Sequence, residues 1–314
     1  GKAMAGILIY SDKEQYAREL LSGARLLAAA AEIPITCVVI NNAGMAESLS
    51  QSGAEVQHIE NGQIVAADTA AIASALKQAV QKLEQSIILL SSDRRGKELA
   101  GRLAQALDAG CLTDVTGITC TNGAMQCSRN SLGGAAIAAQ IITTPVKVIA
   151  VAPRTFEAVL EKEQGRVNKL EVDIKATLKV IETKPKAEDG IDIEAADVIV
   201  AVGQGLSGPE ALPEIEALAD AVGGVVACSK PVATDRKWLS EDRVIGLSGK
   251  KCKPSLAILL GISGQVQFTV GIRDARTIIA VNQDENAYAF HMCDYGWVGD
   301  LHEFAREFQA LLKE

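Results

Sequence analysis

The chain alternates short apolar runs with longer segments of helical periodicity, and this alternation constrains its fold more than any other feature. In the first half, helical patterns span residues 14–31, 67–83 and 96–107, where alanine and leucine recur at a spacing near 3.6. The runs between them are of the kind buried in parallel sheets, at residues 6–10, 35–40, 86–90 and 146–151. This order predicts a doubly wound α/β domain with helices on both faces of a mostly parallel sheet.

A polar stretch ends this first half and marks a domain boundary. Within residues 164–182, the apolar and polar side chains alternate over 176–182, which predicts an edge or hairpin strand. Residues 183–190 then bring charge, proline and glycine together, a composition typical of a linker. We therefore expect two domains, residues 1–190 and 191–314.

The second half restarts the alternation on a smaller scale. Its apolar runs predict strands at residues 198–202, 225–228, 256–260 and 277–281. Its helical patterns lie at residues 209–222, 265–270 and 301–312. The sequence therefore predicts a second doubly wound, mostly parallel-sheet domain of the Rossmann-like type.

Corners rich in glycine or serine interrupt the apolar runs of this second domain. Six corners occur, at residues 202–206, 228–231, 245–250, 261–268, 281–284 and 294–301. Most lie just after an expected strand or just before an expected helix, which is where doubly wound sheets bind ligands. Short side chains let backbone N–H groups approach phosphate closely. Together these corners indicate a large nucleotide-type ligand.

Composition and charge argue against several other classes of function. The 314 residues are 48% hydrophobic and carry a net charge of −8, which provides no cationic face for nucleic acid or a membrane surface. No run reaches the roughly 18 apolar residues of a membrane span, and the start lacks a secretory signal pattern, so we expect a cytoplasmic protein. The seven cysteines form no C-x-x-C pair and the three histidines show no metal-binding spacing, so we expect reduced thiols and no metal site.

The motifs of both halves point to one family. Those of the second half lie at residues 203–206, 229–230, 246–250, 261–267, 280–284 and 294–301. Those of the first half lie at residues 95–100, 107–110 and 114–116. In this order and spacing they resemble the α subunit of electron-transfer flavoproteins, over nearly the full chain. A single glycine motif is weak evidence, but six ordered motifs in one domain are specific.

The resemblance implies that the second domain binds FAD. It also implies that the first domain docks an electron-transfer flavoprotein β subunit, which carries AMP or a second flavin. Arg94 and Arg95 open a helix of the first domain, and a contact with the partner or its nucleotide is one interpretation of them. The family's FAD contacts fall on Gln204, Ser229, Lys230, Ile245, Gly246, Leu247, Ser248, Ser263, Gly264, Gln265, Val266, Gln267, Phe268, Asn282, Asp300 and Leu301.

Elementary chemistry suggests a role for each kind of predicted FAD contact. Ser263 and Gly264 lie at an expected strand-to-helix junction, where hydroxyl and amide donors with a helix dipole behind them would face the pyrophosphate. Asn282 and Asp300 would hydrogen-bond hydroxyl groups of the adenosine or ribitol. Lys230 would lie near the isoalloxazine, where a cation stabilises the anionic reduced flavin and raises its potential.

Three positions depart from the family's pattern. The family usually has arginine at positions 204 and 230 and histidine at position 268, where this chain has Gln204, Lys230 and Phe268. Lysine keeps the charge but loses the planar fork, and glutamine loses a charge that would pair with phosphate. Phe268 has no donor for the flavin's pyrimidine edge. Related members also carry Gly-Leu-Ser-Gly together with phenylalanine, which marks a subgroup associated with bacterial and anaerobic acyl-CoA metabolism.

We therefore expect an electron carrier rather than a catalyst of substrate conversion. The resemblance implies that its FAD takes electrons from an acyl-CoA dehydrogenase, or from NADH through a β-subunit flavin. The electrons would pass to a quinone reductase or another redox partner. Two alternatives stay open. A pyridine-nucleotide-binding oxidoreductase subunit would need an acidic residue at the end of the second strand, and residues 225–228 occupy that place without one. A flavin-free scaffolding subunit would account for the two missing arginines.

Overall fold

The computed structural model of the chain describes residues 6–29, 33–121, 124–132, 136–158, 164–182 and 190–312. The chain divides into two compact units, Gly1–Thr183 and Lys184–Glu314, and each is described by itself. Apart from Gly190, the predicted linker at residues 183–190 lies outside the described residues, so the domain boundary at residue 190 stays a prediction. In the described part of the chain, no helix is long and apolar enough to cross a membrane.

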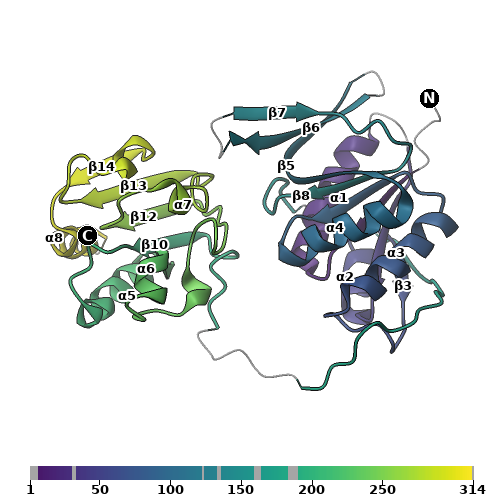
Figure 1. Cartoon of the computed structure of the whole chain (residues 1–314), viewed down its shortest axis with the longest axis horizontal. Coiled ribbons are helices and arrows are strands. Elements are labelled where there is room, and N and C mark those ends of the chain that lie inside the picture. Colours follow the sequence, from purple (N-terminus) through teal and green to yellow (C-terminus); the bar gives the residue numbers. More distant parts are fainter. Residues whose placement is uncertain are drawn as a thin grey trace. The chain divides into compact units, whose positions relative to one another are not determined.

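The described residues of the first unit form a nine-stranded sheet in the order β7-β6-β5-β8-β4-β1-β2-β3-β9 (Figure 1). The pairs β5–β6 and β6–β7 are antiparallel, and the other pairs are parallel. The strands are β1 Ile7–Tyr10, β2 Ile35–Ile40, β3 Glu55–Ile59, β4 Ile87–Ser91, β5 Gly110–Thr121, β6 Ala124–Ser131, β7 Ala136–Gln140, β8 Lys147–Val151 and β9 Arg166–Lys169.

The four apolar runs of the first half form the centre of this sheet. They are β1, β2, β4 and β8, which lie side by side and are almost wholly buried. This confirms the predicted parallel core. The sequence did not predict β3 or the outer strands. Of these, β9 is mostly polar and exposed along its whole length, and β7 is nearly as exposed although its sequence is Ala-Ile-Ala-Ala-Gln.

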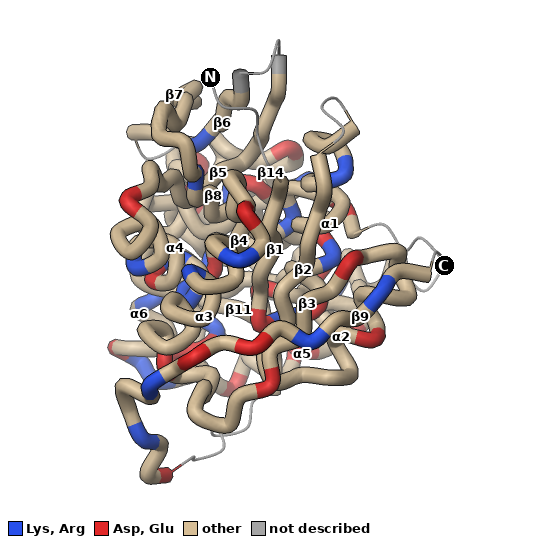
Figure 2. Tube along the Cα trace, turned by 90° about the vertical axis from the view of Figure 1, so that its right-hand side faces the viewer, with Lys and Arg blue, Asp and Glu red and all other residues tan. Residues whose placement is uncertain are grey.

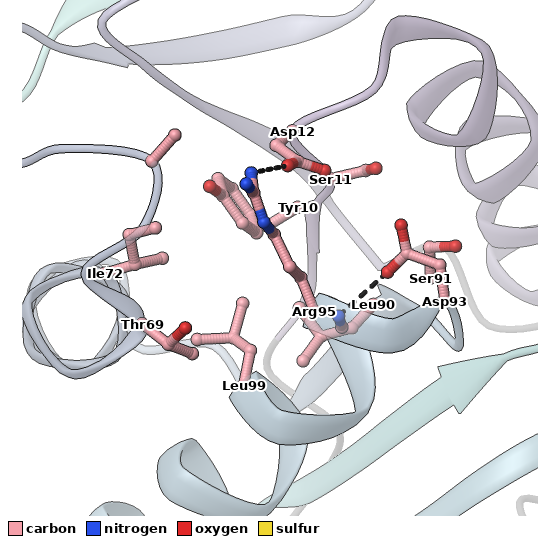
Figure 3. Close-up of a pocket in the computed structure, with 12 residues that line it drawn as sticks. Tyr10, Ser11, Asp12, Thr69, Ile72, Leu90, Ser91, Asp93, Arg95 and Leu99 are labelled. Atoms are coloured by element: carbon pink, nitrogen blue, oxygen red, sulfur yellow. Dashed lines mark hydrogen bonds and ion pairs between the residues drawn. The ribbon is translucent and has the colours of Figure 1, made fainter. Parts of the chain in front are cut away.

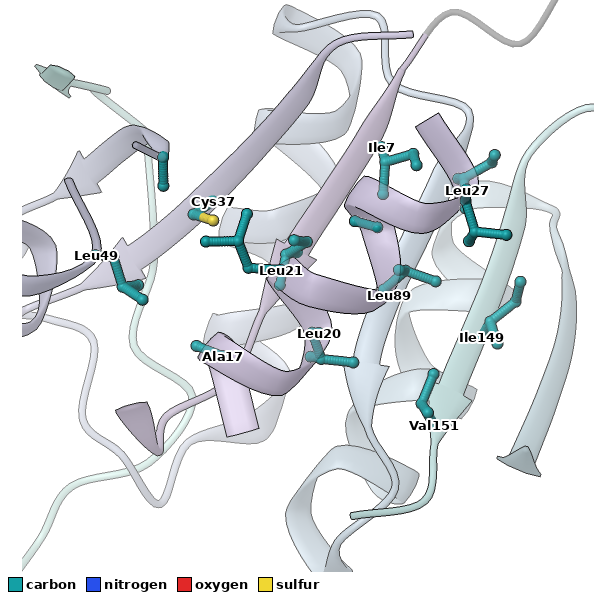
Figure 4. Packing of buried hydrophobic residues seen from close by; sticks show 14 of the residues in the cluster. Ile7, Ala17, Leu20, Leu21, Leu27, Cys37, Leu49, Leu89, Ile149 and Val151 are labelled. Atoms are coloured by element: carbon teal, nitrogen blue, oxygen red, sulfur yellow. The ribbon is translucent and has the colours of Figure 1, made fainter. Parts of the chain in front are cut away.

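Helices cover both faces of this sheet, as predicted. They are α1 Glu14–Ala28, α2 Ala43–Ser50, α3 Thr69–Lys82 and α4 Arg94–Leu107. Because side chains alternate along a strand, Ile7 and Ile9 of β1 pack with α1 and α2, in the cluster shown in Figure 4. Leu8 and Tyr10 point to the opposite face and pack with α3 and α4. The sheet is therefore the shared wall of two cores.

The predicted strand at residues 176–182 is wrong: this segment belongs to no strand, and the chain bends at Thr177. Its amides bond to a side chain instead. The backbone N–H groups of Thr177 and Leu178 donate to Asp68 Oδ2 at 2.7 and 3.2 Å, and the Thr177 hydroxyl donates to Asp68 Oδ1 at 2.5 Å. Asp68 is fully buried and also caps α3 through the Ala71 N–H group at 2.9 Å. We call residues 170–182 the strap, because Asp68 ties this segment to α3.

The second unit is built on a five-stranded sheet whose described strands are all parallel, in the order β11-β10-β12-β13-β14 (Figure 1). The strands are β10 Val198–Val202, β11 Val225–Cys228, β12 Leu256–Leu260, β13 Thr277–Asn282 and β14 Tyr295–Val298. The helices and short 3₁₀ segments are η2 Pro209–Ala211, α5 Leu212–Ala221, α6 Lys230–Thr234, η3 Glu241–Arg243, α7 Val266–Thr269, η4 Tyr288–His291 and α8 Leu301–Leu311.

Alternating side chains of β10 again serve two cores. Val200 and Val202 pack in the cluster that contains α5 and α8, and Ile199 and Ala201 pack in the cluster that contains Phe268 of α7. This confirms a doubly wound second unit. The sequence did not predict β14 or α6. The direction of winding reverses beside β10, because β11 lies on one side of it and β12 on the other. Such a reversal is the usual ligand site of an open parallel sheet.

Candidate functional site

A cavity of about 800 Å³ lies in the second unit at the carboxyl ends of four adjacent strands. Its lining begins one residue after β10, β11 and β12, at Gly203, Ser229 and Gly261, and includes Asn282 at the end of β13. Eleven of the sixteen predicted FAD contacts line it: Gln204, Ser229, Lys230, Ile245, Leu247, Ser248, Ser263, Gln265, Gln267, Phe268 and Asn282. The other five do not: Gly246, Gly264, Val266, Asp300 and Leu301.

The backbones of two loops touch at the point where the winding reverses. The Gly205 N–H group donates to the Gly261 carbonyl oxygen at 3.0 Å. A Cβ on Gly205 would lie 2.7 Å from Gly261 Cα, and a Cβ on Gly203 would lie 2.3 Å from the Gly261 carbonyl oxygen. Only glycine fits at these positions, so the Gly-x-Gly corner brings the two loops together and leaves an open floor to the cavity.

The loop after η3 is pinned against α7. Gly246 has a φ of +138°, and the Leu247 N–H group donates to the Gln267 carbonyl oxygen at 2.7 Å. A Cβ on Gly246 would lie 2.4 Å from that same oxygen. Gly246 therefore shapes the wall without lining the cavity. It positions Ser248 and Leu247, and Leu247 is 69% exposed at the cavity wall.

The helix-dipole role expected for Ser263 and Gly264 is not supported by the local geometry. The helix α7 begins at Val266 with Gln265 as its N-cap, and it is only four residues long. Ser263 precedes a sharp turn at Gly264, whose φ is +81°. The Ser263 carbonyl oxygen accepts from the Ala289 N–H group at 3.2 Å. The short side chain of Ser263 thus opens the cavity, and a one-turn helix adds little dipole.

Lys230 supplies an unpaired cation to the cavity. It is the first residue of α6, directly after the N-cap Ser229, and it is exposed. Among the described residues it has no ion-pair partner. Next to it, Cys228 ends β11 fully buried, and burial raises the pKa of its thiol to about 12. The lysine is therefore the charged group of this wall, while the neighbouring cysteine stays neutral.

Two of the predicted contacts, Asp300 and Leu301, lie outside the cavity lining and stabilise the fold instead. The Asp300 carboxylate caps α8, accepting from the Glu303 and His302 N–H groups at 3.1 and 2.8 Å and from Gln283 Nε2 at 2.8 Å. The two backbone hydrogen bonds, which outweigh its desolvation, hold the pKa of Asp300 below its usual range. Leu301 is buried in the core.

His302 connects the cavity loop to two helices. Its Nε2 lies 3.2 Å from the Ser207 hydroxyl, in the loop that carries Gln204, and its Nδ1 lies 2.7 Å from Glu214 Oε2 on α5. All three side chains lie outside the cavity lining. Their hydrogen bonds join the β10 loop, α5 and the first turn of α8 into one network.

Comparison with known proteins identifies the family. Residues 11–175 match the family described as the electron transfer flavoprotein domain, and residues 192–273 match the electron transfer flavoprotein FAD-binding domain. The chain belongs to the electron-transfer flavoprotein α-subunit family. Its cofactor is FAD.

Curated relatives agree with this assignment. Protein FixB of Salmonella paratyphi A is 31% identical over 303 residues, which cover 94% of each chain. Protein FixB of Escherichia coli O157:H7 is 32% identical over 298 residues with the same coverage. A solved structure from Mycobacterium smegmatis covers 95% of this chain and 54% of its own, with 12% identity and a TM-score of 0.24, a score from which nothing is drawn.

The cavity of this electron-transfer flavoprotein subunit fits FAD. Its volume is within the range of natural ligand sites, and its rim combines glycine backbone, short hydroxyl side chains and amides with one unpaired cation. Phe268 is only 7% exposed and offers an aromatic wall without a hydrogen-bond donor. Seven further lining residues were not among the predicted FAD contacts: Gly203, Gly205, Pro231, Gly261, Ile262, Asp284 and Ala287. The first six lie within the glycine- or serine-rich corners of the sequence, whereas Ala287, in the loop after β13, lies outside all of them.

Proposed function

We propose that this chain is the electron-carrying subunit of a heterodimer. Its FAD would receive electrons from a dehydrogenase of the acyl-CoA type and deliver them to a quinone reductase or another redox partner. The observation that carries the proposal is the cavity of the second unit, where eleven predicted FAD contacts from four strand ends converge. The bound flavin would supply the redox chemistry, and the chain would bind it, orient it and tune it.

The lining residues suggest how the chain would do this. Ser229, Ser248 and Ser263 offer hydroxyl groups, and Gln265 and Gln267 offer amides, for the polar parts of FAD. Phe268 would exclude water from one side of the ring system. Lys230 would favour whichever flavin state carries more negative charge, because opposite charges attract. A pyridine nucleotide has less support, since β11 ends in Cys228 and Ser229 rather than in a carboxylate.

The first domain, residues 1–190, would dock the β subunit, and the second, residues 191–314, would carry FAD as a mobile head. An exposed apolar edge supports the docking role: around β7, Leu132 is 81%, Ile137 73% and Ile141 58% exposed. Unpaired edge strands with apolar side chains favour pairing with another chain. In the view of Figure 2, basic and acidic positions are interspersed rather than gathered into one basic patch, so nucleic acid is not proposed as a partner. Without a membrane-spanning helix among the described residues, we place the complex in the cytoplasm.

An absorption spectrum of the chain purified with its β subunit tests the proposal. We expect oxidised-flavin bands and, after acid release, about one FAD for each α chain. Replacing Lys230→Ala should then lower the flavin potential by tens of millivolts, on the order of one lost charge interaction. The control Arg306→Ala removes an exposed cation of α8 outside the cavity and should leave the potential unchanged. A complex that stays colourless with excess FAD would refute the proposal and favour a scaffolding subunit.

A further inference from the structure

A second crevice lies in the first unit, at the point where that sheet also reverses its winding. β1 stands between β2 and β4, and the chain proceeds from it in one direction to β2 and β3 and in the other to β4 and β8. The crevice opens at the carboxyl ends of β1 and β4, between α3 and α4 (Figure 3). Each half of a doubly wound sheet can bind one mononucleotide at such a point. None of the predicted FAD contacts lies here.

The crevice has an apolar interior and a charged mouth. Ile72 of α3, Leu90 of β4 and Leu99 of α4 line its interior. Across the mouth, Arg95 Nη1 pairs with Asp12 Oδ2 at 3.0 Å, as Figure 3 shows. A ligand with a flat, weakly polar ring and an anionic group would match both parts. The ring would fill the apolar interior of the crevice, and the anionic group would bind the Arg95 guanidinium.

Tyr10 is the observation that points to a guest. Its side chain lines the crevice and is only 7% exposed. Its hydroxyl has no hydrogen-bond partner among the described residues, and Figure 3 shows the ring reaching between Arg95 and Ile72. Burial, reinforced by the nearby Asp12 carboxylate, raises the pKa of Tyr10, so the hydroxyl keeps its proton and can donate it. Because this hydroxyl has no partner within the described part of the protein, it is a ready donor for a ligand.

The mouth also provides cations for an anion. The 14-residue helix α4 begins at Arg94, and its N-cap Asp93, which lines the crevice, already accepts from the Gly96 N–H group at 2.8 Å. Arg94 is exposed and makes no ion pair with any described residue. The other cations nearby are already engaged, since Lys13 pairs with Asp93 at 3.9 Å and Lys97 with Asp114 at 2.8 Å. Arg95 is the cation of the crevice lining, so it is the group that can turn to a phosphate.

The crevice is closed in its present form. It encloses about 20 Å³, room for about one water molecule, with the Arg95 side chain across it. That side chain is 55% exposed and its partner Asp12 31% exposed, so the pair between them is a weak restraint. A phosphate binds a guanidinium in two places and carries more charge than a carboxylate, so it can replace Asp12 as the partner of Arg95. Arg95 then swings outward and the slot opens.

We propose that this crevice is a mononucleotide site, with the base in the slot beside Tyr10 and the phosphate on Arg95. While the site is empty, Asp12 is the ion-pair partner of Arg95, and it competes with the ligand's phosphate for that side chain. The site is independent of FAD in the second unit, so either can be correct without the other.

The test uses the FAD-loaded complex with its β subunit, incubated with 8-azido-AMP, irradiated and digested. We expect label on α-chain peptides that contain Ala66 to Ile72 or Arg94 to Leu99. Equilibrium dialysis with AMP should show one nucleotide for each α chain beyond FAD and beyond any nucleotide held by the β subunit. Adenosine and inorganic phosphate should each bind at least about tenfold more weakly than AMP, because each satisfies only one end of the site.

Three variants of the crevice and one control variant test the site by their affinity for AMP. Tyr10→Phe should weaken AMP about tenfold and leave inorganic phosphate unchanged, and Arg95→Ala should weaken both. Asp12→Asn should tighten AMP several-fold, because the competitor of the phosphate is gone. Arg102→Ala, which removes an exposed cation on the same helix paired with Glu98, should change nothing. Label confined to other peptides, equal AMP affinity in all variants, or weaker binding by Asp12→Asn would each overturn the site.

Discussion

Removing the Asp68 carboxylate should release the strap and destabilise the first unit. Four hydrogen bonds end on this one buried side chain: the cap of α3 from Ala71, two from Thr177 and one from Leu178. In Asp68→Ala the cap loss costs about 1 kcal/mol. The strap donors regain water once the segment detaches, so the two short bonds from Thr177 contribute about 1 kcal/mol each, and the longer bond from Leu178 adds little. We expect the free energy of unfolding of the first unit to fall by about 3 kcal/mol.

Hydrogen exchange is the assay that separates the strap from the rest. Both tryptophans, Trp238 and Trp297, lie in the second unit, so their fluorescence does not report on the first. Peptides covering 170–182 should exchange faster in the variant, while peptides of the second unit stay unchanged. Thr177→Val, which removes only the hydroxyl donor, is the matched control and should cost about 1 kcal/mol. Unchanged exchange of the strap in Asp68→Ala would refute the reasoning.

The pH dependence of the stability of the first unit provides a second test of the role of Asp68. Burial alone would raise the pKa of Asp68, but the hydrogen bonds from Thr177, Ala71 and Leu178 outweigh it, so the pKa lies below its usual value. A carboxyl whose folded pKa is depressed stabilises the fold above its unfolded pKa, near 4, and loses this contribution as the pH falls through the folded value. Urea unfolding of the first unit, followed by far-ultraviolet circular dichroism, should therefore show a steeper acid loss in the wild type than in Asp68→Ala.

Two further predictions concern the FAD cavity. Gly246→Ala should destabilise the second unit by about 2–4 kcal/mol, because the new Cβ clashes with the Gln267 carbonyl oxygen. Gly223→Ala is the control. Gly223 also has a positive φ, +66°, but open space surrounds it, so the substitution should cost only about 1 kcal/mol of backbone strain. Urea midpoints from tryptophan fluorescence distinguish them, and equal losses would contradict a steric cause. His302→Ala should free the β10 loop and weaken FAD about five- to tenfold, with Ser207→Ala weaker in effect. A flavin titration measures this, and unchanged affinity would exclude the network from cofactor binding.

The central strands could be predicted because their signal is local. β1, β2, β4 and β8 are buried on both faces, and each therefore reads as a continuous apolar run. Residues 176–182 carry an equally clear alternation, yet their amides bond to Asp68, about 109 residues earlier in the chain. No pattern within a window of the sequence contains that partner.

The cavity was predictable for a related reason. Residues that directly follow parallel strands meet at one edge of the sheet, so the corners after β10, β11 and β12 converge whatever lies between them. Details that depend on the exact start of a helix were not predictable. The N-cap of α7 is Gln265, and Ser263 lies before the sharp turn at Gly264 rather than at the start of the helix. Asp300 and Leu301 likewise serve the first turn of α8.

The buried thiol at the end of β11 has a consequence for the durability of an electron carrier. Reduced cofactors pass stray electrons to oxygen, and the peroxide that results attacks thiolates rather than thiols. Cys228 stands one residue before the cavity wall, yet its raised pKa leaves almost no thiolate at neutral pH. The thiol that adjoins the cavity wall is thus unreactive toward peroxide, and repeated turnover need not oxidise it.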